Sequence, residues 1–518
     1  MLRLYHGDAS VVELLSEGER AALAIETPLL RFVRDVALAP EVAHVFLTGN
    51  AGDGKTFTAL QAFKPRPGFC VVHDASAFYG AGGDPVDALA RHLSDALTRH
   101  EKIFMSINRG MLERLYNKTQ ESYAGPLREL LISAYEQLRL DVSWGPECAS
   151  VSVIDLGLLD TLSPPVLGLV LEKVRATRPL EELSAPSRES LSAALAALHD
   201  TQVSARLLRG LALVRGAGHH VTMRQLWSLF SYIVTGGRAP ADETPLTLGD
   251  ALGARLFSDE AQGALFELLR AVDDPSLTPQ AELDLAALVD PTLPRQLASC
   301  PGLSFITAEV DLSGLALKRA AAIHQWPRAN DPPKPKPLYD RLVESLRALG
   351  EGWKGGGSLP IELLIQGMYR GLGLWSSRGV YPVWQRLCYD SRRLEAATSL
   401  ANSELELEKL RLGLPRPNPA AQRALEGCWT PPHVWMIYDQ EEPRLRLTPR
   451  LVEVLAALGS GREAFTLTEP ERLHIWRWLS QIGDRAKPAG GHVKLFHPSA
   501  ETPKELTRTW ATGQLSID

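Results

Sequence analysis

Cysteine is scarce and scattered in this chain of 518 residues. The sequence contains no C-x-x-C pair of the kind that binds a metal or carries out redox chemistry. Isolated cysteines behave as small apolar residues in a reducing compartment. The distribution therefore excludes a small disulfide-stapled domain and predicts a cytoplasmic protein. The five cysteines are Cys70, Cys148, Cys300, Cys388 and Cys428.

Long apolar runs and an excess of positive charge are also missing. No uninterrupted apolar run reaches the ~18 residues that a membrane-spanning helix needs. The opening residues, MLRLYHGDAS, lack the basic-then-apolar plan of a signal peptide. The formal net charge is −6, so any contact with DNA or RNA needs a local basic patch. We therefore expect no membrane association, and we expect DNA to be contacted mainly through partner proteins.

The strongest positive signal is a phosphate-binding loop. Residues 49–56 read GNAGDGKT and match every fixed position of G-x-x-x-x-G-K-[ST]. A short apolar run at 45–48 suits a buried strand, and residues 57–63 continue as a helix. This is the strand–loop–helix context that the motif requires. A chance glycine-rich turn is the competing interpretation, and the two matching flanks weigh against it. The sequence therefore predicts that a nucleoside triphosphate binds here.

Each residue type in this loop has a chemical role. Glycines let the backbone curl so that successive N–H groups point at one anion, and the dipole of the following helix adds to that field. Lys55 would reach the β- and γ-phosphates, and the Thr56 hydroxyl would bind Mg²⁺. No guanine-reading N-K-x-D follows the loop, which favours ATP over GTP. The predicted nucleotide-binding residues are Gly49, Asn50, Ala51, Gly52, Asp53, Gly54, Lys55, Thr56 and Phe57.

Further strand candidates alternate with helices, which is typical of a mostly parallel sheet. Three apolar runs end in polar residues: FCVVHD at Asp74, IFMSIN at Asn108 and VSVID at Asp155. Residues 84–100 read as an amphipathic helix with a capping acid and a proline in its first turn. Ligands of such sheets bind at the carboxyl ends of the strands. We therefore expect the three polar residues to gather near the phosphate loop.

The sequence leaves open which acid holds the magnesium. In the AAA+ type of sheet, with strand order 5-1-4-3-2, the metal acid ends strand 3 and a polar sensor ends strand 4. If Asp74 ends strand 3, Asn108 takes the sensor position but strand 2 is missing. If Asp74 ends strand 2, strand 3 ends in Asn108 and the metal acid is missing. We favour Asp74 as the metal ligand, with Asp155 as the substitute.

A turn or helix-cap role is the alternative for Asp74. The neighbouring His73 could orient a water molecule, although a packed or solvated histidine is the simpler interpretation. No catalytic Asp-Glu tandem is present, because Ala75 follows Asp74. Hydrolysis could therefore be slow, use an acid from elsewhere in the chain, or need a partner.

An arginine near the γ-phosphate usually completes a hydrolytic site of this class. Residues 219–230, HHVTMRQLWSLF, begin an amphipathic helix after the sheet, with Thr222 as its cap and Arg224 in its first turn. In AAA+ proteins this place on the lid carries the sensor-2 arginine. Arg319 is a second candidate of the same kind. A solvated surface arginine is the alternative interpretation.

The segments FLTGNAGDGKT, VVHDAS, SINRGML, VIDLGLLD and VTMRQLWSLFSYIVTGG together resemble AAA+-like and STAND-like P-loop ATPases. Within that group they are most similar to ATPase subunits of bacterial restriction and anti-phage modules, such as the DptF type of phosphorothioation-dependent restriction. The resemblance covers roughly residues 40–330. It implies a partner-dependent ATPase that uses ATP and Mg²⁺ beside DNA-processing proteins, in a complex or as a homo-oligomer. The missing Asp-Glu pair departs from a self-sufficient motor.

We predict an α/β protein with four parts. They are a P-loop ATPase domain at 1–180, a helical lid at 181–325, a Pro/Gly-rich linker at 326–360 and a mainly helical partner-binding region at 361–518. The expected function is an ATP-driven switch or assembly factor in a bacterial defence complex. The alternatives are a STAND-type signalling switch and a scaffold with a structural nucleotide. We expect six tryptophans in the core of the last region: Trp375, Trp384, Trp429, Trp435, Trp476 and Trp478.

Overall fold

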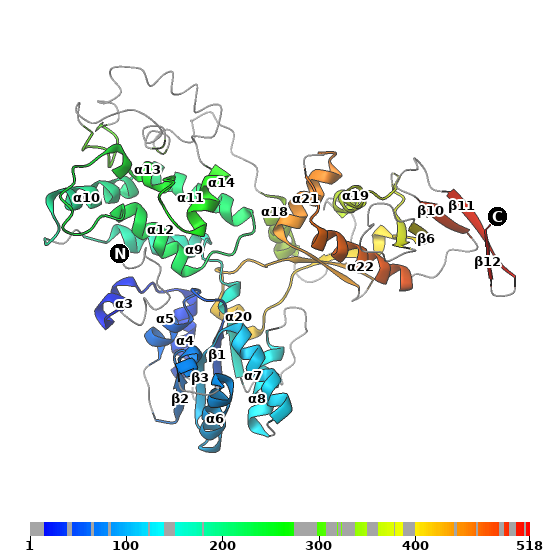
Figure 1. Cartoon of the computed structure of the whole chain (residues 1–518), viewed down its shortest axis with the longest axis horizontal. Coiled ribbons are helices and arrows are strands. Elements are labelled where there is room, and N and C mark those ends of the chain that lie inside the picture. Colours follow the sequence, from blue (N-terminus) through cyan, green and yellow to red (C-terminus); the bar gives the residue numbers. More distant parts are fainter. Residues whose placement is uncertain are drawn as a thin grey trace. The chain divides into compact units, whose positions relative to one another are not determined.

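The fold is described from a computed structural model of the chain (Figure 1). The residues that it describes are 15–38, 44–63, 67–80, 84–122, 125–138, 151–178, 181–273, 298–306, 319, 323, 337–349, 361–377, 379–386, 399–439, 443–462, 465–485, 492–496, 504–511 and 514–517. The chain divides into two units, which we describe separately. Unit 1 comprises Met1–Arg215, His219–Pro333 and Arg416–Thr430, and unit 2 comprises Gly216–Gly218, Lys334–Pro415 and Pro431–Asp518.

A four-stranded, all-parallel sheet forms the centre of unit 1, as the alternating pattern predicts. Its strand order is β2–β3–β1–β4. The strands are β1 (His44–Thr48), β2 (Phe69–Val72), β3 (Lys102–Ser106) and β4 (Val151–Asp155). β1 pairs with β3 on one side and with β4 on the other, where Thr48 lies opposite Asp155. Parallel order brings the carboxyl ends of all four strands to one edge.

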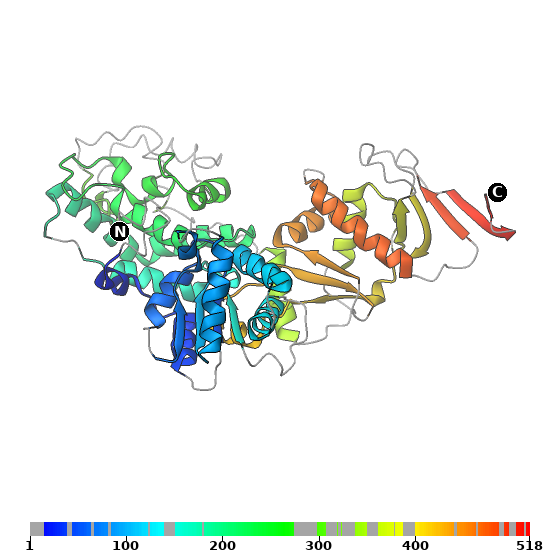
Figure 2. The same cartoon turned by 60° about the horizontal axis from the view of Figure 1, so that its bottom comes forward.

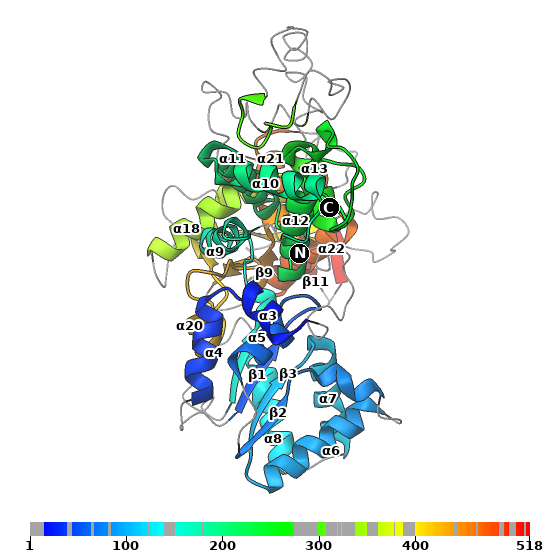
Figure 3. The ribbon, with the colours of Figure 1, turned by 90° about the vertical axis from the view of Figure 1, so that its left-hand side faces the viewer.

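Helices cover both faces of this sheet, which explains why its strands are nearly continuous apolar runs. Val45 and Leu47 belong to one hydrophobic cluster and Phe46, between them, belongs to another. Figure 3 shows α4 and α20 on one side of the sheet and α6, α7 and α8 on the other. The helices around the sheet are α3 (Glu17–Leu23), α4 (Pro28–Leu38), α5 (Lys55–Ala62), α6 (Pro85–Thr98), α7 (Arg109–Ser122), α8 (Pro126–Glu136) and α20 (Pro419–Ala424).

Helix α20 reaches unit 1 from far along the chain. Asn418 accepts a hydrogen bond from the N–H of Ala421 and so caps the helix. Its side-chain amide donates to the carbonyls of Val153, at 2.7 Å, and Gln137, at 3.2 Å. The buried amide therefore fastens this segment to β4. The predicted region 361–518 is for this reason not a single compact part.

The region predicted as a helical lid is helical where the structure describes it. Its helices are α10 (Ala185–His199), α11 (Thr201–Gly216), α12 (Met223–Thr235), α13 (Leu252–Leu256) and α14 (Ala264–Asp273), and α9 (Pro164–Arg175) leads into them. Apolar side chains of α11 and α12, such as Leu211 and Phe230, share one hydrophobic cluster with Leu47 of β1. This packing joins the helical region to the sheet within unit 1.

The prediction of a mainly helical region at 361–518 is wrong. Unit 2 contains a five-stranded sheet of order β12–β11–β10–β6–β5 and a three-stranded sheet of order β7–β8–β9, and Figure 2 shows these strands among the helices. The strands are β5 (Pro382–Arg386), β6 (Ser399–Glu404), β7 (Leu410–Gly413), β8 (Val434–Tyr438), β9 (Arg444–Leu447), β10 (His492–Phe496), β11 (Lys504–Ala511) and β12 (Gln514–Ile517). Short strands with alternating apolar and polar residues, such as RLRL at 444–447, were the missed signal.

Four α-helices and the short 3₁₀ helix η7 (Leu407–Lys409) complete the described part of unit 2. The α-helices are α18 (Leu338–Leu349), α19 (Ile361–Leu372), α21 (Pro449–Gly459) and α22 (Glu469–Arg485). Helix α18 lies inside the range 326–360, which the sequence predicts as a linker, so that prediction is wrong for 338–349. In the described part of the chain, no helix has both the length and the apolar character needed to cross a membrane.

Candidate phosphate-binding site

The motif GNAGDGKT forms the turn between β1 and α5, and its glycines hold a backbone that other residues avoid. Gly49, Gly52 and Gly54 have φ angles of 141°, 91° and 92°, where a side chain is strained. A Cβ atom at position 49 would lie 2.8 Å from Asp53 Oδ2 and 3.0 Å from the backbone nitrogen of Gly157. The local geometry therefore requires glycine at the start of the loop as well as at its turns.

Lys55 is the first residue of α5, and its ammonium group folds back into the loop. Its side chain is buried, and Nζ donates to the carbonyls of Gly49 at 3.2 Å and Asn50 at 2.5 Å. Burial lowers the pKa of Lys55, while the nearby carboxylates of Asp53, Asp74 and Asp155 work to raise that pKa. Among the described residues, Lys55 forms no ion pair with any of these acids. Within the described part of the chain, the hydrogen-bond acceptors of the Lys55 ammonium group are therefore the two carbonyl groups of the loop.

Asp53 stabilises the loop through a hydrogen bond to the loop backbone. The side chain is almost fully buried, and Oδ2 accepts from the backbone N–H of Asn50 at 2.6 Å. Its other oxygen, Oδ1, lies 2.9 Å from Nε2 of His220. The hydrogen bond to Asp53 raises the pKa of His220, although partial burial opposes that shift. One carboxylate thus shapes the phosphate loop and ties it to the segment that precedes α12.

The first turn of α12 lies directly against the loop. Thr222 and Gln225 form a capping box, which confirms the predicted helix start and places Arg224 in the first turn. The backbone N–H of Arg224 donates to the carbonyl of Gly52 at 3.1 Å. A Cβ atom at Gly52 would lie 3.2 Å from Thr222 Oγ1. The structure therefore brings Arg224 to the phosphate loop, and its charge contributes to lowering the pKa of Lys55.

Asp155 ends the strand that pairs directly with β1. Its Oδ1 accepts from the N–H of Gly157 at 2.9 Å, and Oδ2 lies 3.7 Å from a guanidinium nitrogen of Arg109. Burial raises the pKa of Asp155, while the Gly157 hydrogen bond and Arg109 work to lower it. The turn after Asp155 also packs on the loop, because Gly157 lies beside Gly49.

Asp74 follows β2, which β3 separates from β1. Its Oδ1 accepts from both the N–H and the hydroxyl of Ser76, at 2.8 and 2.7 Å. These bonds form a turn that opens the short 3₁₀ helix η1 (Ala75–Gly80). Asp74 thus fills the turn role that the sequence offers as an alternative, and it still lies close enough to influence the pKa of Lys55.

The strand order fits only one of the two AAA+ numberings. With strand 2 missing, β2–β3–β1–β4 corresponds to strands 3-4-1-5, so Asp74 follows strand 3 and Asn108 follows strand 4. Counted without a gap, β3 would be strand 3, but β3 pairs directly with β1, where the AAA+ order has strand 4. Asn108 is exposed, and its carbonyl accepts from the N–H of Leu112 in α7. His73, the residue before Asp74, is half-buried, and burial lowers the pKa of its ring. In an AAA+ sheet this order would put Asp74 at the position of the metal acid, while Asp155 follows the strand that pairs with β1 on its other side.

Two residues near the loop escaped the sequence prediction. Arg109 approaches Asp155, and its backbone N–H donates to the carbonyl of Gly49 at 3.4 Å. The sequence did carry a signal for Arg109, because this residue directly follows Asn108 after a predicted strand. His220 had no comparable signal, since 167 positions separate it from Asp53.

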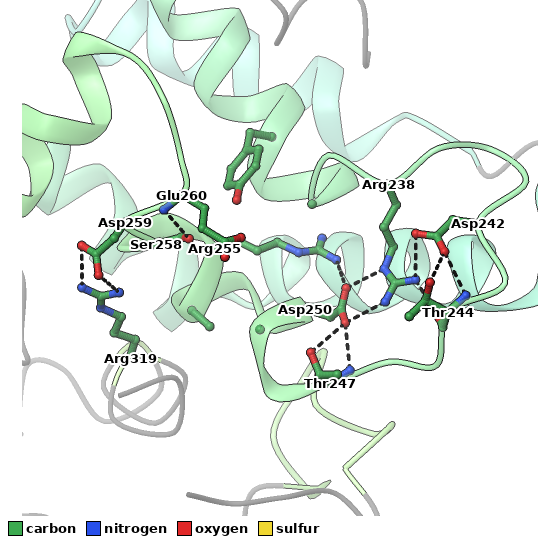
Figure 4. Close-up of a pocket in the computed structure, with 14 residues that line it drawn as sticks. Arg238, Asp242, Thr244, Thr247, Asp250, Arg255, Ser258, Asp259, Glu260 and Arg319 are labelled. Atoms are coloured by element: carbon green, nitrogen blue, oxygen red, sulfur yellow. Dashed lines mark hydrogen bonds and ion pairs between the residues drawn. The ribbon is translucent and has the colours of Figure 1, made fainter. Parts of the chain in front are cut away.

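A polar cavity of about 480 Å³ lies in the helical region of unit 1 (Figure 4). Asp250 pairs there with Arg238 at 2.7 Å and with the buried Arg255 at 3.1 Å. Arg319, the second candidate for a lid arginine, pairs with Asp259 at 3.3 Å. Arg255 also donates to the carbonyls of Ile233 and Val234 near the end of α12. Three arginines that line this cavity are thus paired with acids of the same helical region.

Comparisons of the chain with protein-family models, curated proteins and solved structures found no match. Within the described ranges, no group of three or more His, Cys, Asp or Glu side chains could hold a metal ion by itself. The function is therefore inferred from the geometry of the phosphate loop and its neighbours.

Proposed function

We propose that this protein binds ATP and Mg²⁺ at the phosphate loop and hydrolyses the ATP as a nucleotide-driven switch. One observation carries the proposal. Three glycines at positive φ turn the loop into the start of α5, and the buried Lys55 stands at the mouth of that turn. Backbone N–H groups at a helix start, together with a buried cation, favour a multiply charged phosphate group.

The acids near Lys55 suit a magnesium ion that shares its coordination with phosphate oxygens. Mg²⁺ is usually held by one or two carboxylates together with phosphate and water. Thr56 would supply a hydroxyl, and Asp74 or Asp155 would supply the carboxylate. Asp155 has its Oδ1 engaged by Gly157, while its Oδ2 approaches only Arg109. The bound ion would neutralise charge on the phosphates.

The contact between α12 and the loop supports the switch. The backbone N–H of Arg224 forms a hydrogen bond with Gly52, and the His220 ring forms one with Asp53. The segment at the start of α12 therefore contacts the loop at two points. A loop that shifts around a nucleotide would move this segment. The Arg224 side chain would then neutralise charge that develops on the γ-phosphate. Asn108 would serve as the polar sensor at the strand edge.

A scaffold whose nucleotide is structural is the second candidate. It is favoured by the residue after Asp74, which is Ala75 in place of a catalytic glutamate. The resemblance of the sequence to restriction and anti-phage ATPases extends the first proposal to a subunit of a bacterial defence or DNA-processing complex. In that setting, protein partners or further copies of the chain would complete the hydrolytic site.

Nucleotide binding and phosphate release together test the proposal. Isothermal titration with ATP and Mg²⁺ should show saturable binding, and a malachite-green assay should show release of phosphate, alone or with DNA present. Binding without release under every condition would leave the scaffold as the function. Absence of binding by the folded wild-type protein would overturn both candidates.

A further inference from the structure

The three-stranded sheet of unit 2 has two chemically different faces. One face packs into the hydrophobic core of that unit through Leu410, Leu412, Val434, Met436, Tyr438, Leu445 and Leu447. The opposite face, which we call the open face, carries Arg411, Trp435, Ile437, Arg444 and Arg446. Trp435 and Ile437 belong to none of the hydrophobic clusters of the described residues. Trp435 was expected in the core and is instead half-buried on this face.

The strand register gathers the cations around the two apolar side chains. Trp435 lies opposite Arg446, and Ile437 lies between Arg411 on one neighbouring strand and Arg444 on the other. Residues directly opposite one another in an antiparallel sheet have Cβ atoms about 4.5–5.5 Å apart. None of the five side chains that define the open face is acidic. It is therefore a local positive surface on a chain whose net charge is −6.

Hydrogen-bond donors on and beside the open face lack acceptors. Arg411 Nε and Trp435 Nε1 are buried without an acceptor, and neither ring nitrogen of His433, one a donor and the other an acceptor in the neutral ring, has a partner. Within the described ranges, the exposed guanidinium of Arg446 forms no hydrogen bond or ion pair. Buried donors without acceptors are unfavourable and call for an explanation. On the surface itself, the exposed guanidinium of Arg446 is the donor that a ligand rich in acceptor oxygens would meet.

The two histidines near the open face have pKa values below their ordinary value, so both rings are neutral near pH 7. The ring of His433 stands edge-on to Trp435 at 4.4 Å, and burial together with Arg446 lowers the pKa of His433 to about 3. On α22, Arg446 and Arg477 add to the effect of burial and lower the pKa of His474. The positive field of Arg446 thus reaches beyond the sheet.

We propose that the open face binds single-stranded nucleic acid, with phosphates at the arginines and a base stacked on Trp435. Unpaired bases can stack on an aromatic side chain, and arginines beside it meet the backbone. Duplex DNA keeps its bases inside the stack and offers none to Trp435. An acidic peptide offers carboxylates but no flat ring, so it would leave the indole without a role.

Fluorescence anisotropy with a labelled single-stranded oligonucleotide of about 20 nucleotides tests this proposal. The full-length protein is used without ATP, so the measurement does not depend on the phosphate loop. Affinity should fall as salt rises, because bound phosphates release counterions. The double variant Arg411→Glu/Arg446→Glu should bind at least about tenfold more weakly. Trp435→Ala should lose about tenfold, while Trp435→Phe keeps most of the affinity because it keeps a ring.

The control is Arg91→Glu, which makes the same charge change as Arg446→Glu alone, at an exposed position of α6 in unit 1. This variant should bind like the wild type, and so should Lys55→Ala, which separates this surface from the ATP site. Thermal melting checks that each variant folds. If Trp435→Ala does not fold, the affinity of the single variant Arg446→Glu decides whether the proposal stands, because the Arg446 side chain is exposed and its replacement should not disturb folding.

Three results would overturn the proposal. The first is the absence of salt-dependent binding, and the second is binding that the open-face variants do not change. The third is equal affinity for a duplex of the same sequence, or for an acidic peptide of the same charge, with the same loss in Trp435→Ala.

Discussion

The loop at residues 49–56 of unit 1 and the open face of unit 2 are the two sites at which we propose anion binding, and they are built in different ways. The loop would use backbone N–H groups of consecutive residues, whose conformation depends on Gly49, Gly52 and Gly54 at positive φ. The open face uses side chains from three strands, brought together by register. A backbone site depends on one local conformation, whereas a side-chain surface is a sum of separate charges.

This difference predicts how binding at each region responds to substitutions. The loop should lose its function when a single residue changes, because its cation and its curvature serve one phosphate group. The affinity of the open face for single-stranded nucleic acid should fall in steps as arginines are removed. The slope of the logarithm of the binding constant against the logarithm of the salt concentration should decrease in size by roughly 0.7 for each phosphate that an arginine no longer binds. The following predictions test the first half of the comparison, from the largest expected effect to the smallest.

Lys55→Ala should abolish ATP turnover and weaken ATP binding by at least about 100-fold, which corresponds to roughly 3 kcal/mol. The reason is that the phosphates lose the buried ammonium group at the mouth of the loop. Isothermal titration and phosphate release measure the two effects. Lys409→Ala, an exposed lysine paired with Glu406, is the control. Wild-type affinity and turnover in Lys55→Ala would show that residues 49–56 are not a phosphate site.

Arg224→Ala should lower turnover by a factor of about 10³ and leave ATP affinity nearly unchanged. The side chain would act when charge develops on the γ-phosphate, whereas the loop and Lys55 hold the ground state. Steady-state turnover and titration separate the two effects. Arg209→Ala, a half-buried arginine of α11, is the matched control. Wild-type turnover in a stably folded Arg224→Ala protein would remove this arginine from the mechanism.

Asp74→Asn should reduce Mg²⁺-dependent turnover by about 10- to 100-fold, and by more than Asp155→Asn does. An amide keeps the size of the side chain but removes the charge that a metal needs. The measurement is turnover against Mg²⁺ concentration for both variants. A larger loss in Asp155→Asn would assign the metal to the strand beside β1, and Asp74 would remain the turn residue bonded to Ser76.

The bond between His220 and Asp53 should make stability depend on pH. The pKa of His220 is raised above its ordinary value of 6.5, so the folded state favours the protonated ring. This contribution is complete below about pH 6.5 and is lost as pH rises through the raised pKa. Because the ring is partly exposed, we expect less than about 1 kcal/mol. Melting temperatures of wild type and His220→Gln, followed against pH, measure it.

The two melting curves should differ most in acid and converge in alkali. His199→Gln, an exposed histidine of α10, should follow the wild type throughout. A constant difference between wild type and His220→Gln at every pH would show that the ring contributes packing and no charge.

Local signals in the sequence predicted the sheet domain well. The strands and the loop were predicted in their places, and Asp84 and Thr222 cap α6 and α12 as their spacing indicates. Each of these features depends on residues within about four positions of one another, so the sequence carries the whole signal.

Unit 2 was predicted poorly for an equally physical reason. Its strands are short, and the stretch 410–413 carries too few alternating positions to be distinguished from a helical turn or a loop. Trp435 was expected in the core because tryptophan is large and apolar. Strand register decides which face it joins, and register is a property of the paired strands.

By itself, the sequence determined the turn between β1 and α5, because the positive φ angles and the helix start are dictated by consecutive residues. Only the tertiary structure decided what surrounds that loop. It placed His220 on Asp53 across 167 positions and brought the N–H of Arg224 to Gly52. It also gathered three arginines around Trp435 and Ile437 by pairing β7, β8 and β9. Contacts between distant segments are chosen by the burial of their shared apolar faces, and no local pattern records that choice.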